Sequence, residues 1–332
     1  MEGITEVTNT TLKEIAEKFR ELDDFILCGH MNPDGDCISS CLALNLALTQ
    51  LGKKVRVVCA EEQLKTDFLD FLPNYSEIKY CGKVKDDPNV FVMIDVPNDK
   101  RMGHAASALK SRCAHKFTID HHLEQDKWAD FVYTDTSSAS CSMIIWDLIK
   151  CLGVELTPEI AECCLTGVYT DTGNFQWQNS DIRAFRAALE MIEAGAVPYI
   201  ICENVNMRRS MASLTMQSVV IDNCEIFCDG KAAISTISKS DMQRVGATKA
   251  DCELLINLLR SIDGTEIVAI IREDGNTLRA SLRALGNRDV REIAMSLGGG
   301  GHIGAAGCTF KCSLEEGKSI VKAEIEKAFA ES

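Results

Sequence analysis

The chain has 332 residues, of which 46% are hydrophobic and 25% are charged, and its formal net charge is −14. This composition predicts a globular protein long enough for two domains. The negative charge argues against a groove for long duplex nucleic acid, which needs a basic surface. It does not exclude a small anionic substrate, because carboxylates that hold divalent metals count as negative charges in this sum.

The chain shows neither a membrane segment nor a disulfide framework. No apolar run reaches the roughly 18 residues of a membrane helix, and the N-terminus has no basic start followed by an apolar region. We therefore expect a cytoplasmic protein that does not associate with membranes. The sixteen cysteines contain no Cys-x-x-Cys pair, so we expect them to be reduced and mostly buried, without a structural zinc site.

The first part of the chain alternates apolar strands with helical patterns. Strands are expected at residues 24–28, 54–59, 89–94, 115–119 and 131–134. Helices are expected at 12–22, 37–51, 103–111, 137–152, from Pro158 to about residue 169, and at 181–193. This alternation predicts βαβ units and an α/β domain with a mainly parallel, five-stranded sheet flanked by helices.

The second part predicts a smaller α/β domain with a mixed sheet. Two strands, 218–227 and 231–237, flank the turn sequence Cys228-Asp229-Gly230, and another pair is expected at 266–272 and 277–282. A strand at 306–311 and helices at 251–261, 289–297 and from residue 314 complete it. The predicted domains are residues 1–195 and 219–332, joined by a helical linker at 196–218.

Polar residues gather where the strands of the first domain end. In parallel sheets, ligands lie outside the carboxyl ends of the strands. Neighbouring residues of a strand point to opposite faces, so three polar residues in a row fit a position where a strand has just ended. The residues at these ends are His30, Asp34, Asp36, Asp95, Asp120, His121 and His122. Four carboxylates and three imidazoles are therefore predicted at one edge of the sheet.

Each of these residues also has a simpler explanation. Residues 32–35, Asn-Pro-Asp-Gly, form a turn sequence, and Asp36 can merely cap the next helix. Asp95 can cap a helix or pair with Lys100 or Arg101. Asp171 ends an apolar helix, where the helix dipole disfavours a carboxylate and a metal would compensate, although a surface position remains open. As a metal site, carboxylates mixed with imidazoles suit manganese, iron or zinc better than calcium.

A glycine run in the second domain is a candidate anion site. Four glycines at 298–301 precede His302, and small residues follow at 305–307, so exposed amides there can hold an anion. The alternative is a flexible linker. Among the arginines just upstream, Arg283 is predicted to contact phosphate because it follows an apolar strand into a turn; the alternative is a solvated surface charge.

Together these motifs resemble the Asp-His-His (DHH) phosphoesterases. The residues that carry the resemblance are the His30–Asp36 segment, Asp95, Asp120-His121-His122 and Asp171, in this order. Residues 299–302 and 305–307 are similar to the signature of the DHH-associated C-terminal domain. The subgroup most similar to this chain is the two-domain oligoribonuclease (nanoRNase) and 3′-phosphoadenosine-5′-phosphate (pAp) phosphatase proteins. The resemblance covers about residues 10–325.

The resemblance implies two divalent metal ions, expected to be manganese, in a cleft between the domains. One would be bound by His30, Asp34 and Asp95, and the other by Asp36, Asp95, His121 and Asp171. Asp95, Asp120 and His122 would be the catalytic residues, with Asp120 orienting the histidines and His122 facing the phosphate. The implied substrate contacts are Arg101, Arg283, Gly300, Gly301 and His302. Cys37 stands where the family often has a small residue.

The expected activity is hydrolysis of short oligoribonucleotides or linear dinucleotides to mononucleotides, with pAp as a further substrate. Two alternatives remain at this point: an inorganic pyrophosphatase with the same metal ligands, and a nucleotide-binding regulator with a silent site. The partners expected are short RNA oligonucleotides or small phosphorylated nucleotides. The oligomeric state is left open, a homodimer included.

Overall fold

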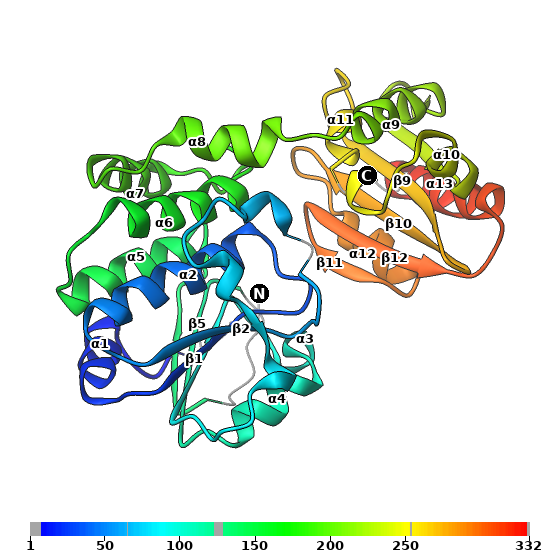
Figure 1. Cartoon of the computed structure of the whole chain (residues 1–332). Helices are drawn as coiled ribbons and strands as arrows, with labels where there is room; N and C mark the ends of the chain where they lie inside the picture. The colour runs from blue at the N-terminus through cyan, green and yellow to red at the C-terminus, as the bar shows by residue number, and fades with distance from the viewer. Residues whose placement is uncertain (1–7, 65, 123–128, 253, 331–332) are drawn as a thin grey trace. The chain divides into compact units, whose positions relative to one another are not determined.

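The computed structural model describes residues 8–64, 66–122, 129–252 and 254–330 (Figure 1). The chain splits into two compact units, Met1–Arg208 and Arg209–Ser332. The division falls inside the segment 196–218 that the sequence predicts as a helical linker. Helix α8 (Pro198–Cys202), a π-helical turn (Glu203–Met207) and most of helix α9 (Met211–Asp222) occupy this segment. No helix among the described residues is both long and apolar enough to span a bilayer.

A six-stranded parallel sheet forms the centre of the first unit, with strand order β3-β2-β1-β4-β5-β6. The strands are β1 (Phe25–Cys28), β2 (Val55–Cys59), β3 (Lys79–Tyr80), β4 (Val90–Ile94), β5 (His115–Asp120) and β6 (Phe131–Thr134). The sequence predicted the parallel sheet correctly but with five strands. It missed β3 because two residues are too few to show an alternating pattern.

Helices cover both faces of this sheet, as a parallel sheet requires. They are α1 (Leu12–Glu21), α2 (Gly35–Gln50), α3 (Asp99–Met102), α4 (His104–Ser111), α5 (Cys141–Leu152), α6 (Pro158–Asp171) and α7 (Ile182–Glu193). Phe25 and Leu27 of β1 enter the core shared with α1, α2, α5 and α6, whereas Ile26 and Cys28 enter the core shared with α3 and α4. All four side chains are fully buried.

The second unit has a mixed six-stranded sheet of order β11-β12-β10-β9-β8-β7, in which only β8 and β9 are parallel. Its strands are β7 (Glu225–Phe227), β8 (Ala232–Ile237), β9 (Ile267–Asp274), β10 (Thr277–Ala284), β11 (Gly300–His302) and β12 (Ala305–Phe310). Its helices are α9, α10 (Lys239–Val245), α11 (Ile256–Arg260), α12 (Val290–Ser296) and α13 (Leu314–Ala330). The mixed sheet was predicted.

Two local predictions in the second unit were wrong. Residues 218–222 were expected to begin a strand, but they belong to α9, where Met216, Val219 and Val220 are buried at helical spacing. The glycines at 300 and 301 were expected in a loop, yet they form the short edge strand β11 against β12. In both cases the local sequence allowed two conformations, and contacts with other segments of the unit determine which one forms.

Candidate metal centre

Three neighbouring strands bring the predicted polar residues to one edge of the first sheet. His30 follows β1, Asp95 follows β4, and Asp120 is the last residue of β5. Because the sheet order is β1-β4-β5, these three strand ends lie side by side. Asp34 is the N-cap of α2 and accepts a hydrogen bond from the amide of Cys37 at 3.0 Å. The helix-cap explanation of this loop is therefore compatible with a ligand role, since Asp34 keeps its second oxygen.

Asp171 reaches the same edge because α6 packs closely against α2. A Cβ atom at Gly167 of α6 would lie 1.8 Å from Ser142 Oγ and 2.6 Å from Asp36 Oδ1, so only glycine allows this approach. Asp171 ends α6, and its Oδ2 lies 3.7 Å from His121 Nε2. Asp171 is thus part of the cluster rather than a surface residue.

Substitution of Gly167 tests how far the cluster depends on this helix contact. Gly167→Ala should gain about 1 kcal/mol of helix propensity, but overpacking against the fully buried Ser142 costs about 1–3 kcal/mol. We expect a lower melting temperature and weaker divalent-ion binding, measured by calorimetry. Gly304→Ala, where no atom lies within 4 Å of the new Cβ, should change neither. Unchanged metal affinity in Gly167→Ala would show that the α6 contact does not position the cluster.

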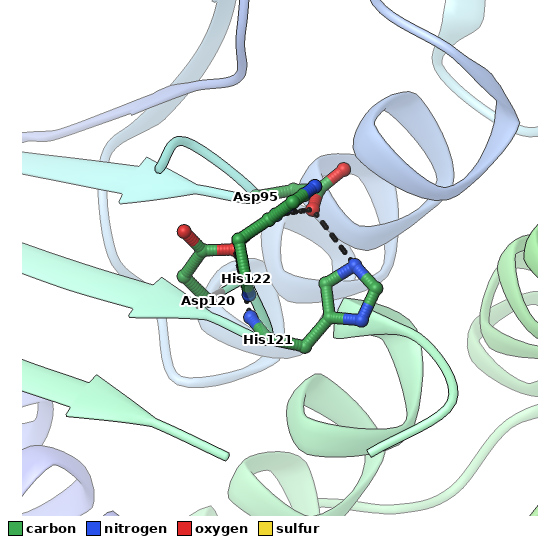
Figure 2. A group of neighbouring side chains, drawn as sticks. All are labelled: Asp95, Asp120, His121 and His122. Atoms are coloured by element: carbon green, nitrogen blue, oxygen red, sulfur yellow. Dashed lines mark hydrogen bonds and ion pairs between the residues drawn. The ribbon is translucent and has the colours of Figure 1, made fainter. Parts of the chain in front are cut away.

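Asp95 lies at the centre of the cluster (Figure 2). Its side chain is 2% exposed, and its Oδ1 lies 3.4 Å from both His121 Nε2 and His122 Nδ1. Its Oδ2 lies 3.6 Å from His30 Nε2. Asp95 has a φ of +61°, a left-handed conformation that is uncommon for residues other than glycine, asparagine and aspartate. Left-handed residues other than glycine are often found at functional sites.

The distances around Asp95 fit metal coordination better than hydrogen bonding. Within the described residues, Asp95 Oδ1 is buried and has no partner that satisfies hydrogen-bond geometry. Separations of 3.4–3.7 Å are too long for good hydrogen bonds, but two ligand atoms that share a cation at about 2.0–2.2 Å each lie this far apart. The donor set of carboxylates and imidazoles therefore fits a divalent cation.

The ligand atoms form overlapping groups around Asp95. Each residue of a group offers one possible ligand atom, and these atoms all lie within 4.8 Å of one another. The three groups are His30, Cys37 and Asp95; Asp36, His121 and Asp171; and Asp95, Asp120, His121 and His122. His30 Nε2 also lies 3.5 Å from Asp34 Oδ2. All six predicted metal ligands are thus brought together, and Cys37 joins them.

The two candidate ligand histidines are oriented by backbone carbonyls. His30 Nδ1 lies 2.8 Å from the carbonyl oxygen of Met31, and His121 Nδ1 lies 3.3 Å from that of Ser138. If each Nδ1 carries the proton and donates, each Nε2 keeps its lone pair toward the carboxylates. This is the usual arrangement behind a metal-bound imidazole.

The pKa shifts reflect the crowding of buried carboxylates in the cluster. Burial, and next the negative charge of Asp95, raise the pKa of Asp36 to about 6. Burial, and next the negative charge of Asp36, raise the pKa of Asp171 well above its usual value. Burial alone would lower the pKa of His30, but Asp34 and Asp95 raise it to about 11. The pKa of His121 is also raised: burial alone would lower it, but Asp95 and the other carboxylates raise it. Divalent cations would balance these carboxylates without protons.

Asp120 holds the Asp-His-His turn. Its Oδ1 accepts hydrogen bonds from the amides of His121 at 2.7 Å and His122 at 3.2 Å, and lies 2.8 Å from His122 Nδ1. Asp120 is fully buried, while the His122 side chain is 24% exposed. The three consecutive polar residues therefore differ in position: Asp120 lies beneath the turn, His121 points toward Asp95 and Asp171, and His122 is the most exposed.

One set of contacts was not predicted from the sequence. Asp36 Oδ2 accepts a hydrogen bond from the amide of Cys141 at 2.6 Å, and its Oδ1 accepts one from the amide of Ser142 at 2.9 Å. These amides belong to the first turn of α5, whose N-cap is Ser140. The serine-rich segment 137–142 signalled a helix start, but no sequence pattern indicated which carboxylate would lie there.

The predicted substrate-contact residues occupy separate places. Arg101, in α3, lies beside the cluster, with its Nη2 3.4 Å from His30 Nδ1. Arg283, Gly300, Gly301 and His302 all belong to the second unit. There Arg283 pairs with Ala305, and Gly300 and the backbone of His302 pair with β12 on its other side. A Cβ at Gly300 would meet no atom within 4 Å, whereas a Cβ at Gly301 would lie 2.6 Å from the Ala305 carbonyl oxygen, so only the position at Gly300 is open in this pair.

Among the described residues, Arg283 differs from Arg288 and Arg291 in making no ion pair with a carboxylate. Arg288 pairs with Glu266 and Arg291 pairs with Asp289, whereas Arg283 makes no salt bridge in the part of the chain that the structure describes. Burial, followed by the positive charges of Arg260 and Arg279, lowers its pKa. A half-buried guanidinium among like charges favours an anionic ligand.

The fold and the cluster define a two-domain α/β protein with a candidate divalent-metal centre. The N-terminal domain of the DHH family matches residues 24–168, and the DHHA1 domain matches residues 229–331. The chain therefore belongs to the DHH family with a DHHA1 domain, and is a phosphoesterase of this class. The resemblance seen in the sequence is confirmed.

Known proteins similar to this chain cover almost its full length. A bifunctional oligoribonuclease and PAP phosphatase, NrnA, from Thermus thermophilus is 29% identical over 301 residues, covering 90% of this chain and 88% of that protein. The crystal structure of an exopolyphosphatase-related protein from Bacteroides fragilis has a TM-score of 0.90 at 26% identity, covering 97% of this chain and 98% of the other. Exonuclease RecJ bound to manganese shares the fold, with a TM-score of 0.55 at 14% identity over 99% of this chain and 96% of the other.

Proposed function

We propose that the protein is a manganese-dependent phosphoesterase that hydrolyses short oligoribonucleotides and linear dinucleotides to mononucleotides, and pAp to AMP. The observation that carries this proposal is the Asp95 cluster, in which a buried carboxylate lies between two groups of metal-ligand side chains. The similarity to NrnA of Thermus thermophilus, a bifunctional oligoribonuclease and PAP phosphatase, supports the substrate class. The net charge of −14 fits short substrates better than long nucleic acid.

The residues present fit two divalent ions. His30, Asp34 and Asp95 would hold one ion, while Asp36, Asp95, His121 and Asp171 would hold the other. This mixture of imidazole and carboxylate ligands suits manganese. When bound, such a pair supplies an activated water and neutralises charge that develops on the phosphoryl oxygens.

The chain's own side chains would position the phosphoester. Asp120, by its contact with His122 Nδ1, fixes the orientation of this imidazole, which would bind a phosphoryl oxygen or protonate the leaving oxygen. Arg101, next to His30, would contact the substrate on the side of the first ion. Asp36 and His121 would stay in place through their bonds to the α5 amides and the Ser138 carbonyl.

The second domain would bind a further part of the substrate. Arg283, together with the open backbone position at Gly300 and with Gly301 and His302, would bind a second phosphate or the nucleotide end. Arg283 is the strongest candidate in this unit because, among the described residues, it makes no ion pair with a carboxylate and lies among like charges.

The direct test offers pApA, pAp and pyrophosphate in parallel to the purified, manganese-loaded protein. We expect release of mononucleotide from pApA and of phosphate from pAp, with little from pyrophosphate. Preference for pyrophosphate would replace the proposal with an inorganic pyrophosphatase. Binding of nucleotide without release of any product, with metals bound, would point to a regulator instead.

Replacing Arg283 tests the contribution of the second domain. Arg283→Ala should raise the KM for pApA about tenfold or more and leave metal binding unchanged, because a charge-assisted phosphate contact contributes about 1.5–3 kcal/mol. Arg291→Ala, which removes an arginine already paired with Asp289, serves as the matched control. A KM for Arg283→Ala equal to that of the control would exclude Arg283 from substrate binding.

A further inference from the structure

A cysteine thiol lies among the candidate ligands of one of the two metal ions. Cys37 is the third residue of α2 and is fully buried, and the residues beside it, His30 and Asp95, are only 3% and 1% exposed. One possible ligand atom from each of these three residues lies within 4.8 Å of the others. The ion proposed to bind His30, Asp34 and Asp95 therefore has a sulfur atom within reach, whose chemistry differs from that of the other ligands.

The fold places the Cys37 sulfur near the ends of β1 and β4. A Cβ atom at Gly29, which follows β1 and precedes His30, would lie 1.9 Å from Cys37 Sγ and 3.5 Å from the carbonyl oxygen of Ile94. Because residue 29 is glycine, the sulfur can occupy this space. Ile94 is the last residue of β4, and Asp95 follows it. The sulfur thus lies beside the two segments that carry the buried candidate ligands.

Other buried thiols near the cluster do not share this position. Cys41 and Cys141 both interact electrostatically with the buried carboxylates of the cluster. Cys141 Sγ, however, donates a hydrogen bond to the Ile119 carbonyl at 3.4 Å. Neither cysteine joins a group of possible ligand atoms in the part of the chain that the structure describes, whereas Cys37 does. The position of Cys37 is therefore specific among the thiols around the cluster.

The same place contains a buried carboxylate that lacks a hydrogen-bond donor. Asp95 Oδ1 has no hydrogen-bond partner among the described residues, and Asp95 Oδ2 lies 3.6 Å from His30 Nε2. His30 Nε2 lies 3.5 Å from Asp34 Oδ2. A buried anionic oxygen without a donor favours a cation. The Asp34 side chain is 59% exposed, so an ion can enter from the solvent on this side.

We propose that Cys37 is a further ligand of this ion and that it increases the preference of the site for thiophilic divalent cations, such as zinc, over manganese. The inference rests on the metal centre of the proposed function. With Cys37, the site offers one imidazole, two carboxylates and one thiolate, all of which are ligand types that bind zinc. A thiolate favours zinc and cadmium, whereas manganese prefers oxygen ligands.

The binding step releases one proton. The Cys37 thiol gives its proton to the solvent, and the sulfur donates an electron pair to the ion. No oxidant or other reactant is needed. Zinc would therefore compete with manganese for this site, and the competition would depend on a side chain that is not one of the six ligands assigned above.

Absorption spectroscopy with cobalt tests the sulfur ligand without measuring activity. Cobalt added to the metal-free, full-length protein under non-thiol reducing conditions should produce a near-ultraviolet sulfur-to-cobalt charge-transfer band. The band should be absent from Cys37→Ala and from Cys37→Ser, which keeps nearly the same side-chain volume. Cys41→Ala, which removes a buried thiol one turn further along α2, should keep the band. A band that survives both Cys37 variants, or a wild type that binds cobalt without this band, would overturn the proposal.

Competition between ions tests the selectivity. Because other cysteines can also bind cadmium, the affinities are compared between Cys37→Ser and the control Cys41→Ala. The affinity for cadmium should be at least about tenfold lower in Cys37→Ser, while the affinity for manganese should agree within about threefold. Equal losses for both ions would show that Cys37 contributes only packing, and unchanged affinities would exclude it as a ligand.

These measurements separate the inference from the proposed function. A wild type that binds manganese and hydrolyses pApA, but gives no sulfur-to-cobalt band, would overturn this inference alone. A wild type that binds no divalent ion would overturn both.

Discussion

Asp95→Asn should abolish metal-dependent hydrolysis, with a loss of at least about 10³-fold in kcat/KM, or about 4 kcal/mol of transition-state stabilisation. The reason is that Asp95 contributes one oxygen toward His30 and the other toward His121 and His122. An amide cannot supply two anionic ligand atoms. Asparagine is preferable to alanine for this experiment because it tolerates the φ of +61° at this position.

The Asp95 experiment needs both a kinetic and a binding measurement. Calorimetric titration with manganese should show that the affinity and the number of ions bound fall along with activity. Asp67→Asn, at an exposed aspartate of the same unit, should behave like the wild type. Retained full activity in Asp95→Asn would contradict the assignment of Asp95 as the ligand shared by both ions.

His122→Gln should lower kcat about 10²–10⁴-fold while leaving the affinity for manganese within a few-fold of the wild type. The structure separates His122 from the other two histidines: its Nδ1 faces Asp120 at 2.8 Å, and its side chain is more exposed than those of His30 and His121. These contacts fit a group that acts on the substrate rather than a metal ligand. His104→Gln, at the exposed start of α4, is the control.

The two measurements on His122 distinguish its possible roles. If metal affinity falls in parallel with kcat, then His122 is a metal ligand, a role that its place in the group with Asp95 and His121 also allows. If neither quantity changes, then the imidazole contributes to neither step. Only a fall in kcat with retained metal binding supports the role proposed above.

The sequence was sufficient to predict that the polar residues of the first domain come together. An apolar strand that ends in charged residues can be recognised from the local sequence. Because the carboxyl ends of parallel strands lie at the same edge of the sheet, the charged residues that follow different strands are expected to be close in space. His30, Asp95 and Asp120 follow this rule directly. Asp171 lies on a helix, and its place was inferred from the unfavourable position of a carboxylate at a helix C-terminus.

Other features depend on packing between distant segments, which no local pattern records. The amides of Cys141 and Ser142 bind Asp36 only because α5 packs beside α2. Likewise, Gly167 is needed because Ser142 and Asp36 lie against it. The end of α9 was misassigned because its sequence, rich in β-branched residues near Val219 and Val220, also fits a strand.

Electron paramagnetic resonance of the manganese-titrated protein tests the central claim most directly. The arrangement of ligands on both sides of Asp95 predicts two manganese ions per chain in a magnetically coupled pair, and Asp95→Asn should abolish the coupling. A spectrum of single, uncoupled ions at saturation, or a stoichiometry of one ion per chain, would contradict the two-metal centre.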